Sequence, residues 1–163
     1  MIRRLLALAA AGVALVAAGC TPTVHLEPAA HANDPRCADV TVRVPDAIAD
    51  FDRVWTDAQA TAAWGDPSAV LFTCGLEPPG PSTLQCVSIG GVDWIVDDSD
   101  FPNLRLTTYG RTPAAQAYVD TEAVSSNDVL SSLSNAVATL PENTRCTTVE
   151  DAEMIDEDVP QTS

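Results

Sequence analysis

The chain has 163 residues, of which 23 are acidic and 8 are basic, and its formal net charge at pH 7 is −15. Every basic residue is an arginine. Such an acidic surface repels nucleic acid and anionic lipid headgroups, which excludes binding to either through a basic patch. The length is sufficient for one domain with a core of its own.

The first twenty residues have the pattern of a targeting signal. Arg3 and Arg4 precede an uninterrupted run of small and apolar residues at 5–18, which is too short to span a membrane as a helix. Small residues directly before Cys20 resemble the bacterial lipobox, in which the cysteine is lipidated and the preceding peptide is removed. An ordinary secretory signal is the alternative. We predict a lipoprotein signal peptide at 1–19 and a lipid anchor that holds the chain on the extracytoplasmic face of the cell membrane.

The number of cysteines agrees with a lipid on Cys20, because four others remain in an oxidising compartment. They are Cys37, Cys74, Cys86 and Cys146. We predict two disulfides, and the sequence alone leaves three pairings open. The strand register described below favours Cys74 with Cys86, which leaves Cys37 with Cys146.

Residues 20–36 are rich in proline and have little apolar periodicity, so we predict a tether between the lipid and the domain. Both histidines of the chain, His25 and His31, lie in this segment. They lack a nearby third ligand, and we therefore predict no metal site there.

Residues 38–44 alternate apolar and polar side chains, which predicts a half-buried strand. Pro45 would end this strand. For residues 46–52 we predict a short helical turn.

A helix is predicted over residues 57–64. Thr56 and Gln59 have the spacing of a capping box at its start. Trp55 lies just before this segment and Trp64 lies at its end, and we expect both to pack in the core.

The stretch 69–97 is predicted to be a three-strand antiparallel meander. A proline-rich turn at 78–81 joins the first two strands, and a glycine pair at 90–91 joins the second to the third. In this register Cys74 faces Cys86 at about 5 Å, within disulfide reach. The first strand is apolar on both sides, as in an interior strand of a sheet.

Two further strands are predicted at 104–109 and 115–120, followed by a helix at 127–140 with Ser126 as its cap. One face of this helix is apolar and would cover the sheet. We therefore predict a single α+β domain at 37–148, with an antiparallel sheet of about five or six strands, a C-terminal helix packed on one face and two disulfides.

Beyond the domain the chain becomes acidic. Six of the nine residues from Glu150 to Asp158 are acidic. We predict that 149–163 is a disordered acidic tail, with cation capture or partner docking as the functional alternative.

The domain lacks the residues of common catalytic sites. Neither histidine nor lysine occurs between Cys37 and Cys146, so the most frequent general base is absent. The sequence has no GxSxG, HExxH or GxxxxGK motif. We therefore predict a protein that is not an enzyme and that holds no cofactor.

One cluster of acidic residues could have a function: Asp93, Asp97, Asp98 and Asp100. Crowded carboxylates can bind calcium, for which Asp97, Asp98 and Asp100 are weak candidates. Two of them could also act as the acid and base of a glycoside hydrolase. A solvated acidic loop is the simpler interpretation, and it is the one we prefer.

Arg111 follows Tyr109 and Gly110 at a predicted hairpin tip. It could bind an anion, with Arg105 and Tyr109 on the same strand face. In a chain this acidic, an ion pair with a surface carboxylate is the simpler expectation.

Several short motifs together resemble an actinobacterial family of small envelope proteins that is catalogued as a domain of unknown function, number thirty-five fifteen. The motifs are WGDP at 64–67, VL at 70–71 leading to CG at 74–75, EPPGP at 77–81, Cys86, GVDW at 91–94 and YGR at 109–111. The similarity runs from about Cys20 to Cys146 and does not include the acidic tail. The resemblance implies an envelope location and a compact cysteine-bearing domain, and it transfers no catalytic residue.

Our first functional hypothesis is a non-enzymatic binding or accessory module of the cell envelope. It would work through its acidic surface or an aromatic groove around Trp94, with an envelope protein as partner and no nucleic acid. The alternative is a carboxylate-based hydrolase, assisted by calcium, with its site near Asp97 to Asp100. A purely structural envelope component is a third possibility.

Overall fold

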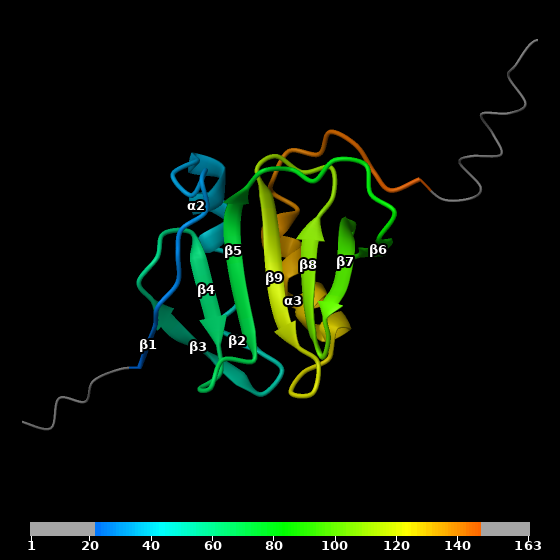
Figure 1. Ribbon diagram of the computed structural model, residues 1–163. Helices are drawn as coiled ribbons and strands as arrows, with labels where there is room; N and C mark the ends of the chain where they lie inside the picture. The colour runs from blue at the N-terminus through cyan, green and yellow to red at the C-terminus, as the bar shows by residue number, and fades with distance from the viewer. Residues whose placement is uncertain (1–21, 148–163) are drawn as a thin grey trace, which may run out of the picture.

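The computed structural model describes residues 22–147, and its framework is a single nine-stranded sheet (Figure 1). The order of strands along the sheet is β1-β3-β4-β5-β9-β8-β7-β6, and β2 also pairs with β3. The elements in chain order are β1 (Thr23–Val24), α2 (Pro35–Thr41), β2 (Ala47–Ile48), β3 (Phe51–Thr56), β4 (Thr61–Trp64), β5 (Val70–Leu76), β6 (Gln85–Ile89), β7 (Val92–Asp100), β8 (Asn103–Thr108), β9 (Ala114–Asp120) and α3 (Ser126–Val137). The predicted antiparallel α+β architecture is confirmed, although five or six strands was too few.

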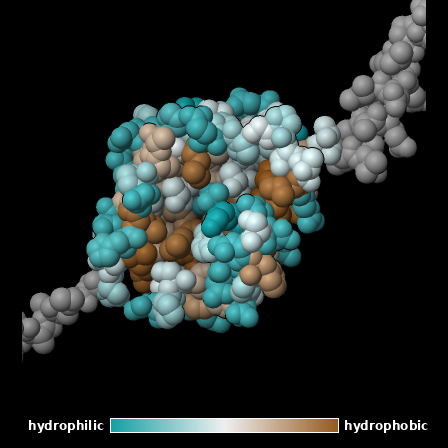
Figure 2. Space-filling view, viewed as in Figure 1, coloured by the Kyte–Doolittle hydropathy of each residue, from teal (hydrophilic) through white to brown (hydrophobic). Residues whose placement is uncertain are grey.

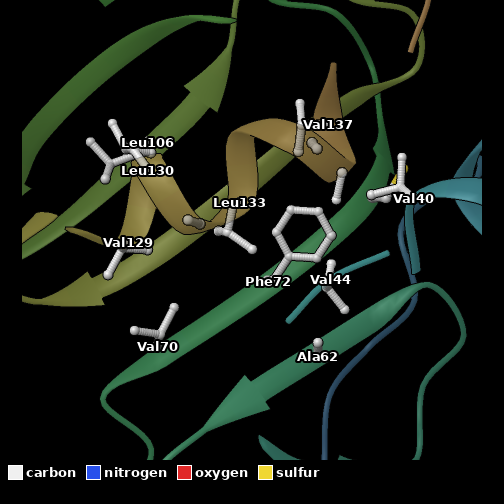
Figure 3. Close-up of a cluster of buried hydrophobic side chains, with 14 of the residues drawn as sticks. Val40, Val44, Ala62, Val70, Phe72, Leu106, Val129, Leu130, Leu133 and Val137 are labelled. Carbon is white, nitrogen blue, oxygen red and sulfur yellow. The ribbon is translucent and has the colours of Figure 1, made fainter. Parts of the chain in front are cut away.

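Helix α3 covers one face of the sheet, as the sequence predicted, and it lies behind β8 and β9 in Figure 1. Figure 3 shows Leu133 and Val137 of α3 beside Phe72 of β5, with Val40 and Val44 approaching from the other side. All five side chains are buried. Burial of each contributes about 1.5–3 kcal/mol. This layer is the core that holds the sheet and both helices together.

Strand β5 lies inside the sheet, between β4 and β9, as its two apolar faces predicted. The β6–β7 hairpin is also confirmed, with Ile89 opposite Val92 across the glycine turn. Strands β8 and β9 occupy the predicted segments. The hairpin predicted between β5 and β6 is wrong. Both edges of β5 are already paired, so the chain crosses to the far edge of the sheet before β6 begins.

The predicted disulfide pairing is wrong for the same reason. All four predicted cysteines form disulfides, but the pairs are Cys37–Cys74 and Cys86–Cys146, with Cα–Cα distances of 5.6 Å and 6.3 Å. The expected Cys74–Cys86 pair cannot form because β5 and β6 are not neighbours. One disulfide ties α2 to β5, and the other ties β6 to the end of the described chain.

The strand predicted at 38–44 is also wrong, because residues 35–41 form helix α2. Asp34 caps this helix by accepting a hydrogen bond from the amide of Arg36 at 2.9 Å, and a proline occupies the first turn. Val40 and Val44 are buried, whereas Val42 is 78% exposed. The buried valines are four residues apart, which is a helical spacing that the apolar–polar alternation concealed.

The helix predicted at 57–64 and the helical turn at 46–52 are corrected to hairpins, which β2, β3 and β4 form. The Thr61 hydroxyl bonds the Thr56 hydroxyl at 2.8 Å, so Thr56 closes the loop between β3 and β4 instead of capping a helix. Trp64 is buried as predicted, but Trp55 is exposed.

The segment predicted as a tether lies against the domain over its described part. Its first strand, β1, pairs with β3. The amide of His31 bonds the carbonyl of Gly75 at 2.9 Å, and Ala32 is buried. Gly75 has a φ of 103°, and a Cβ there would lie 2.5 Å from the backbone of Ala32. The predicted signal peptide at 1–19, Cys20 and the tail at 149–163 lie outside the described residues.

Candidate functional site

A groove of about 480 Å³ lies between the end of α2 and strand β3. We call it the β3 groove. Its size is typical of small-molecule sites, which usually measure about 300–1,000 Å³. The residues that line it are Thr41, Asp46, Arg53, Val54, Trp55, Thr56, Ala58, Ala60 and Thr61.

Arg53 and Trp55 are the two side chains of the β3 groove best suited to bind a ligand. They are two residues apart on one strand, and this spacing places both side chains on the same face of β3. Trp55 is 71% exposed. An exposed indole beside a guanidinium offers a ligand a flat apolar surface and a positive charge within one groove.

Arg53 differs from the other arginines in residues 22–147 because it alone has no ion pair there. The other five each bind a carboxylate: the pairs are Arg36–Asp34, Arg43–Asp39, Arg105–Asp100, Arg111–Glu142 and Arg145–Glu142. A guanidinium has five N–H donors. In a chain with so many acidic residues, an arginine without a partner in a groove is available to an anionic ligand.

Hydrogen bonds fix the wall of the β3 groove. The buried Thr61 hydroxyl donates to the carbonyl of Ala58 at 2.6 Å. Next to it, the carboxylate of Asp57 lies 2.6 Å from Nδ1 of His25 and accepts from the amide of Leu26 at 3.0 Å. The hydrogen bond with His25 is the main cause that lowers the pKa of Asp57. The β3–β4 turn is therefore held to the N-terminal segment.

Among the acidic residues singled out in the sequence, Asp97 and Asp100 have hydrogen-bond partners of their own. Asp97 accepts a hydrogen bond from the amide of Ser99 at 3.0 Å, and contacts with Ser99 lower its pKa. Asp100 binds Arg105 at 3.1 Å. No three acidic, histidine or cysteine side chains in the part of the chain that the structure describes are grouped so as to hold a metal ion. The arrangement thus gives the calcium candidates, including Asp98, no common centre.

Arg111 pairs with a carboxylate as predicted, but it is buried and not at the surface. Its guanidinium donates to Glu142 at 2.9 Å and to the carbonyl of Leu140 at 2.7 Å. Nearby, the carboxylate of Asp93 accepts from the amide of Cys146 at 2.7 Å. These bonds fasten the segment after α3 to the sheet, so the YGR motif has a structural role.

The aromatic groove expected around Trp94 is not present, because Trp94 is completely buried. Trp64 is also buried, and its Nε1 donates to the carbonyl of Pro45 at 3.0 Å. The exposed tryptophan is Trp55, which the sequence analysis had assigned to the core. Arg53 and Trp55 are two residues apart in a run rich in strand-forming side chains. This pattern could have revealed the groove.

A second groove, of about 550 Å³, lies near the opposite edge of the sheet. Among the described residues, no charged side chain lines it; the lining residues are Pro81, Ser82, Leu84, Cys86, Ser88, Ile95, Tyr109, Cys146 and Thr147. Figure 2 shows hydrophobic residues gathered both near this edge and over β4, on the side where β1 lies. The β3 groove is the better candidate because it has a charge that can select and orient a ligand.

Comparison with known proteins identified a family model described as a protein of unknown function (DUF3515), which matches residues 4–145. The match confirms the resemblance drawn from the motifs. No curated protein and no solved structure matches the chain. Within residues 22–147, no helix has the length and apolar character needed to cross a membrane.

Proposed function

The chain belongs to the DUF3515 family of proteins of unknown function, and we propose that it is a binding module held on the extracytoplasmic face of the cell membrane by a lipid on Cys20. The anchor is supported by the sequence of residues 3–20, in which two arginines precede an apolar run and small residues precede Cys20. The disulfides support it as well: they use four of the five cysteines, which leaves Cys20 available for lipidation.

The binding function rests on one observation: Arg53, which has no ion pair within residues 22–147, lies beside the exposed Trp55 in the β3 groove. Arginine binds phosphate or carboxylate groups through two parallel hydrogen bonds. Asp46 also lines the groove, so a positively charged group on the ligand would be favoured as well. We therefore propose an amphipathic ligand with a zwitterionic head and an apolar part that rests on Trp55. As a non-enzymatic module, the protein would deliver this ligand to an envelope protein partner.

Isothermal titration calorimetry with dodecylphosphocholine, below its micellar concentration, tests this function. The protein would be the mature chain with Cys20→Ser, which prevents lipidation. We expect saturable binding at one site. Loss of a charge-assisted hydrogen bond costs about 1.5–3 kcal/mol, so Arg53→Gln should weaken binding by about tenfold or more.

The matched control is Arg105→Gln, since Arg105 is another partly exposed arginine on the sheet but lies outside the groove. It should leave the affinity unchanged. Absence of saturable binding, or equal loss in both variants, would contradict the proposed ligand class.

A further inference from the structure

The chain leaves the domain toward Cys20 directly beside the β3 groove. Thr23 of β1 is the register partner of Trp55, and Val24 is the partner of Thr56. The amide of Asp57 donates to the carbonyl of Val24 at 3.3 Å. Figure 1 shows β1 at the edge of the sheet next to β3. These contacts fix the start of the described chain against the strand that carries Arg53 and Trp55.

The anchor can reach only a short distance from this point. Three residue steps separate Cys20 from Thr23, and they span at most about 11 Å when fully extended. The headgroup region of one leaflet is about 5–8 Å thick. A lipid on Cys20 therefore holds Trp55 close to the bilayer surface, where tryptophan is a favoured interfacial residue.

The net charge of the chain and the charges that line the groove determine which class of lipid headgroup can bind. Removal of the signal peptide takes away Arg3 and Arg4 and lowers the formal net charge from −15 to −17. So negative a chain is repelled by anionic lipids. A zwitterionic headgroup avoids this repulsion, and it matches the opposite charges of Arg53 and Asp46 in the groove lining.

We propose that the β3 groove holds a zwitterionic phospholipid drawn from the leaflet in which Cys20 is anchored, with the phosphate at Arg53, the ammonium group toward Asp46 and the apolar part against Trp55. This inference rests on the proposed function, because it needs both the lipid on Cys20 and a ligand-binding groove. It adds the source of the ligand, which is the membrane and not a soluble pool.

Quenching of tryptophan fluorescence by brominated lipid tests the inference. The lipidated full-length mature protein is reconstituted into vesicles of phosphatidylethanolamine and phosphatidylcholine, with plain or brominated acyl chains. Trp64 and Trp94 are completely buried, so quenching at the lipid surface reports on Trp55. We expect brominated lipid to lower the emission of the wild-type protein by the same fraction by which Trp55→Phe lowers it in plain vesicles. Arg53→Gln should reduce this quenching, whereas Arg105→Gln should not.

The outcomes separate the two proposals. Equal emission in plain and brominated vesicles, with dodecylphosphocholine binding intact, would overturn the membrane source and leave the ligand class standing. Full quenching in Arg53→Gln would show contact of Trp55 with the bilayer without a lipid held in the groove, and would also overturn the inference. Absence of a lipid on Cys20, measured by mass spectrometry of the intact protein, would overturn both the anchor and the inference.

Discussion

Arg53 and Trp55 are two residues apart on β3, and both line the same groove. In the described part of the chain the arginine has no carboxylate partner, and Trp55 is 71% exposed whereas Trp64 and Trp94 are buried. The two residues together are the basis of the proposed binding function.

Trp55→Ala should weaken binding of dodecylphosphocholine by about tenfold, because the apolar part of the ligand loses about 1.5 kcal/mol of contact. Calorimetric titration measures the change. Phe101→Ala is the matched control, since Phe101 is equally exposed at 74% but lies between β7 and β8. An unchanged affinity in Trp55→Ala would show that the indole is not part of the site.

Cys20→Ala should block processing of the signal peptide or release the protein from membranes, because the acyl chains are the proposed attachment. Membrane fractionation with immunoblotting measures both effects. Unchanged retention and unchanged processing would refute lipid anchoring through this residue.

The two disulfides should leave no titratable thiol in the unreduced mature protein. Digestion with trypsin and chymotrypsin, which cuts after Leu84, separates Cys74 from Cys86. Mass spectrometry should then find the peptide of Cys37 joined to that of Cys74, and the peptide of Cys86 joined to that of Cys146. Free thiols would contradict the disulfides, and a linked Cys74–Cys86 peptide would show that the topology is wrong.

Arg111→Gln should lower the free energy of unfolding by about 3–5 kcal/mol, because it breaks a buried ion pair. Arg145→Gln is the matched control. It contacts the same Glu142, but its side chain is 74% exposed, so its loss should cost about 1 kcal/mol or less. Urea denaturation of the three proteins measures the difference, and equal effects would mean that Arg111 does not clamp the segment after α3.

Asp34→Asn should reduce stability at neutral pH but not in strong acid. Hydrogen bonds from Arg36 lower the pKa of Asp34 from 3.8 to about 2, and Nε of Arg36 lies 2.8 Å from its carboxylate. The carboxylate is ionised in both the folded and the unfolded chain above pH 3.8, so its contribution is complete there. It is lost as the pH falls toward 2. Asparagine keeps the helix cap, so only the ionic part is removed.

Thermal unfolding of the wild type and Asp34→Asn from pH 7 to pH 2 measures this dependence. The difference between their melting temperatures should stay constant down to about pH 4 and then shrink. A difference that is independent of pH over the whole range would mean that the Asp34 carboxylate does not stabilise the fold through its charge.

The C-terminal half of the fold could be predicted because its signals are local. The glycine pair at 90–91 specifies a hairpin, and the apolar stripe of α3 specifies a covering helix. The N-terminal half could not be predicted in this way, because its local sequence patterns fit both strands and helices. The valines at 38–44 suit either a strand or a helix, and the cap at Asp34 together with burial of Val40 and Val44 decided for the helix.

The position of β6 also could not be read from nearby residues. A proline-rich turn suggests a hairpin, but β5 takes β9, more than thirty residues later, as its second neighbour. The groove was missed for a related reason. Trp55 could be placed only once β3 was known to be a strand, and a capping-box pattern at Thr56 had indicated a helix.

The central claim is that the β3 groove binds an amphipathic ligand at Trp55, and ¹⁹F NMR tests it most directly. Protein labelled with 5-fluorotryptophan has three resonances, one for each tryptophan, and Trp55→Phe assigns the resonance of the groove. We expect dodecylphosphocholine to shift the Trp55 resonance saturably, while those of the buried Trp64 and Trp94 stay in place. A Trp55 resonance that does not move, or three resonances that drift together without saturation, would contradict a binding site in the groove.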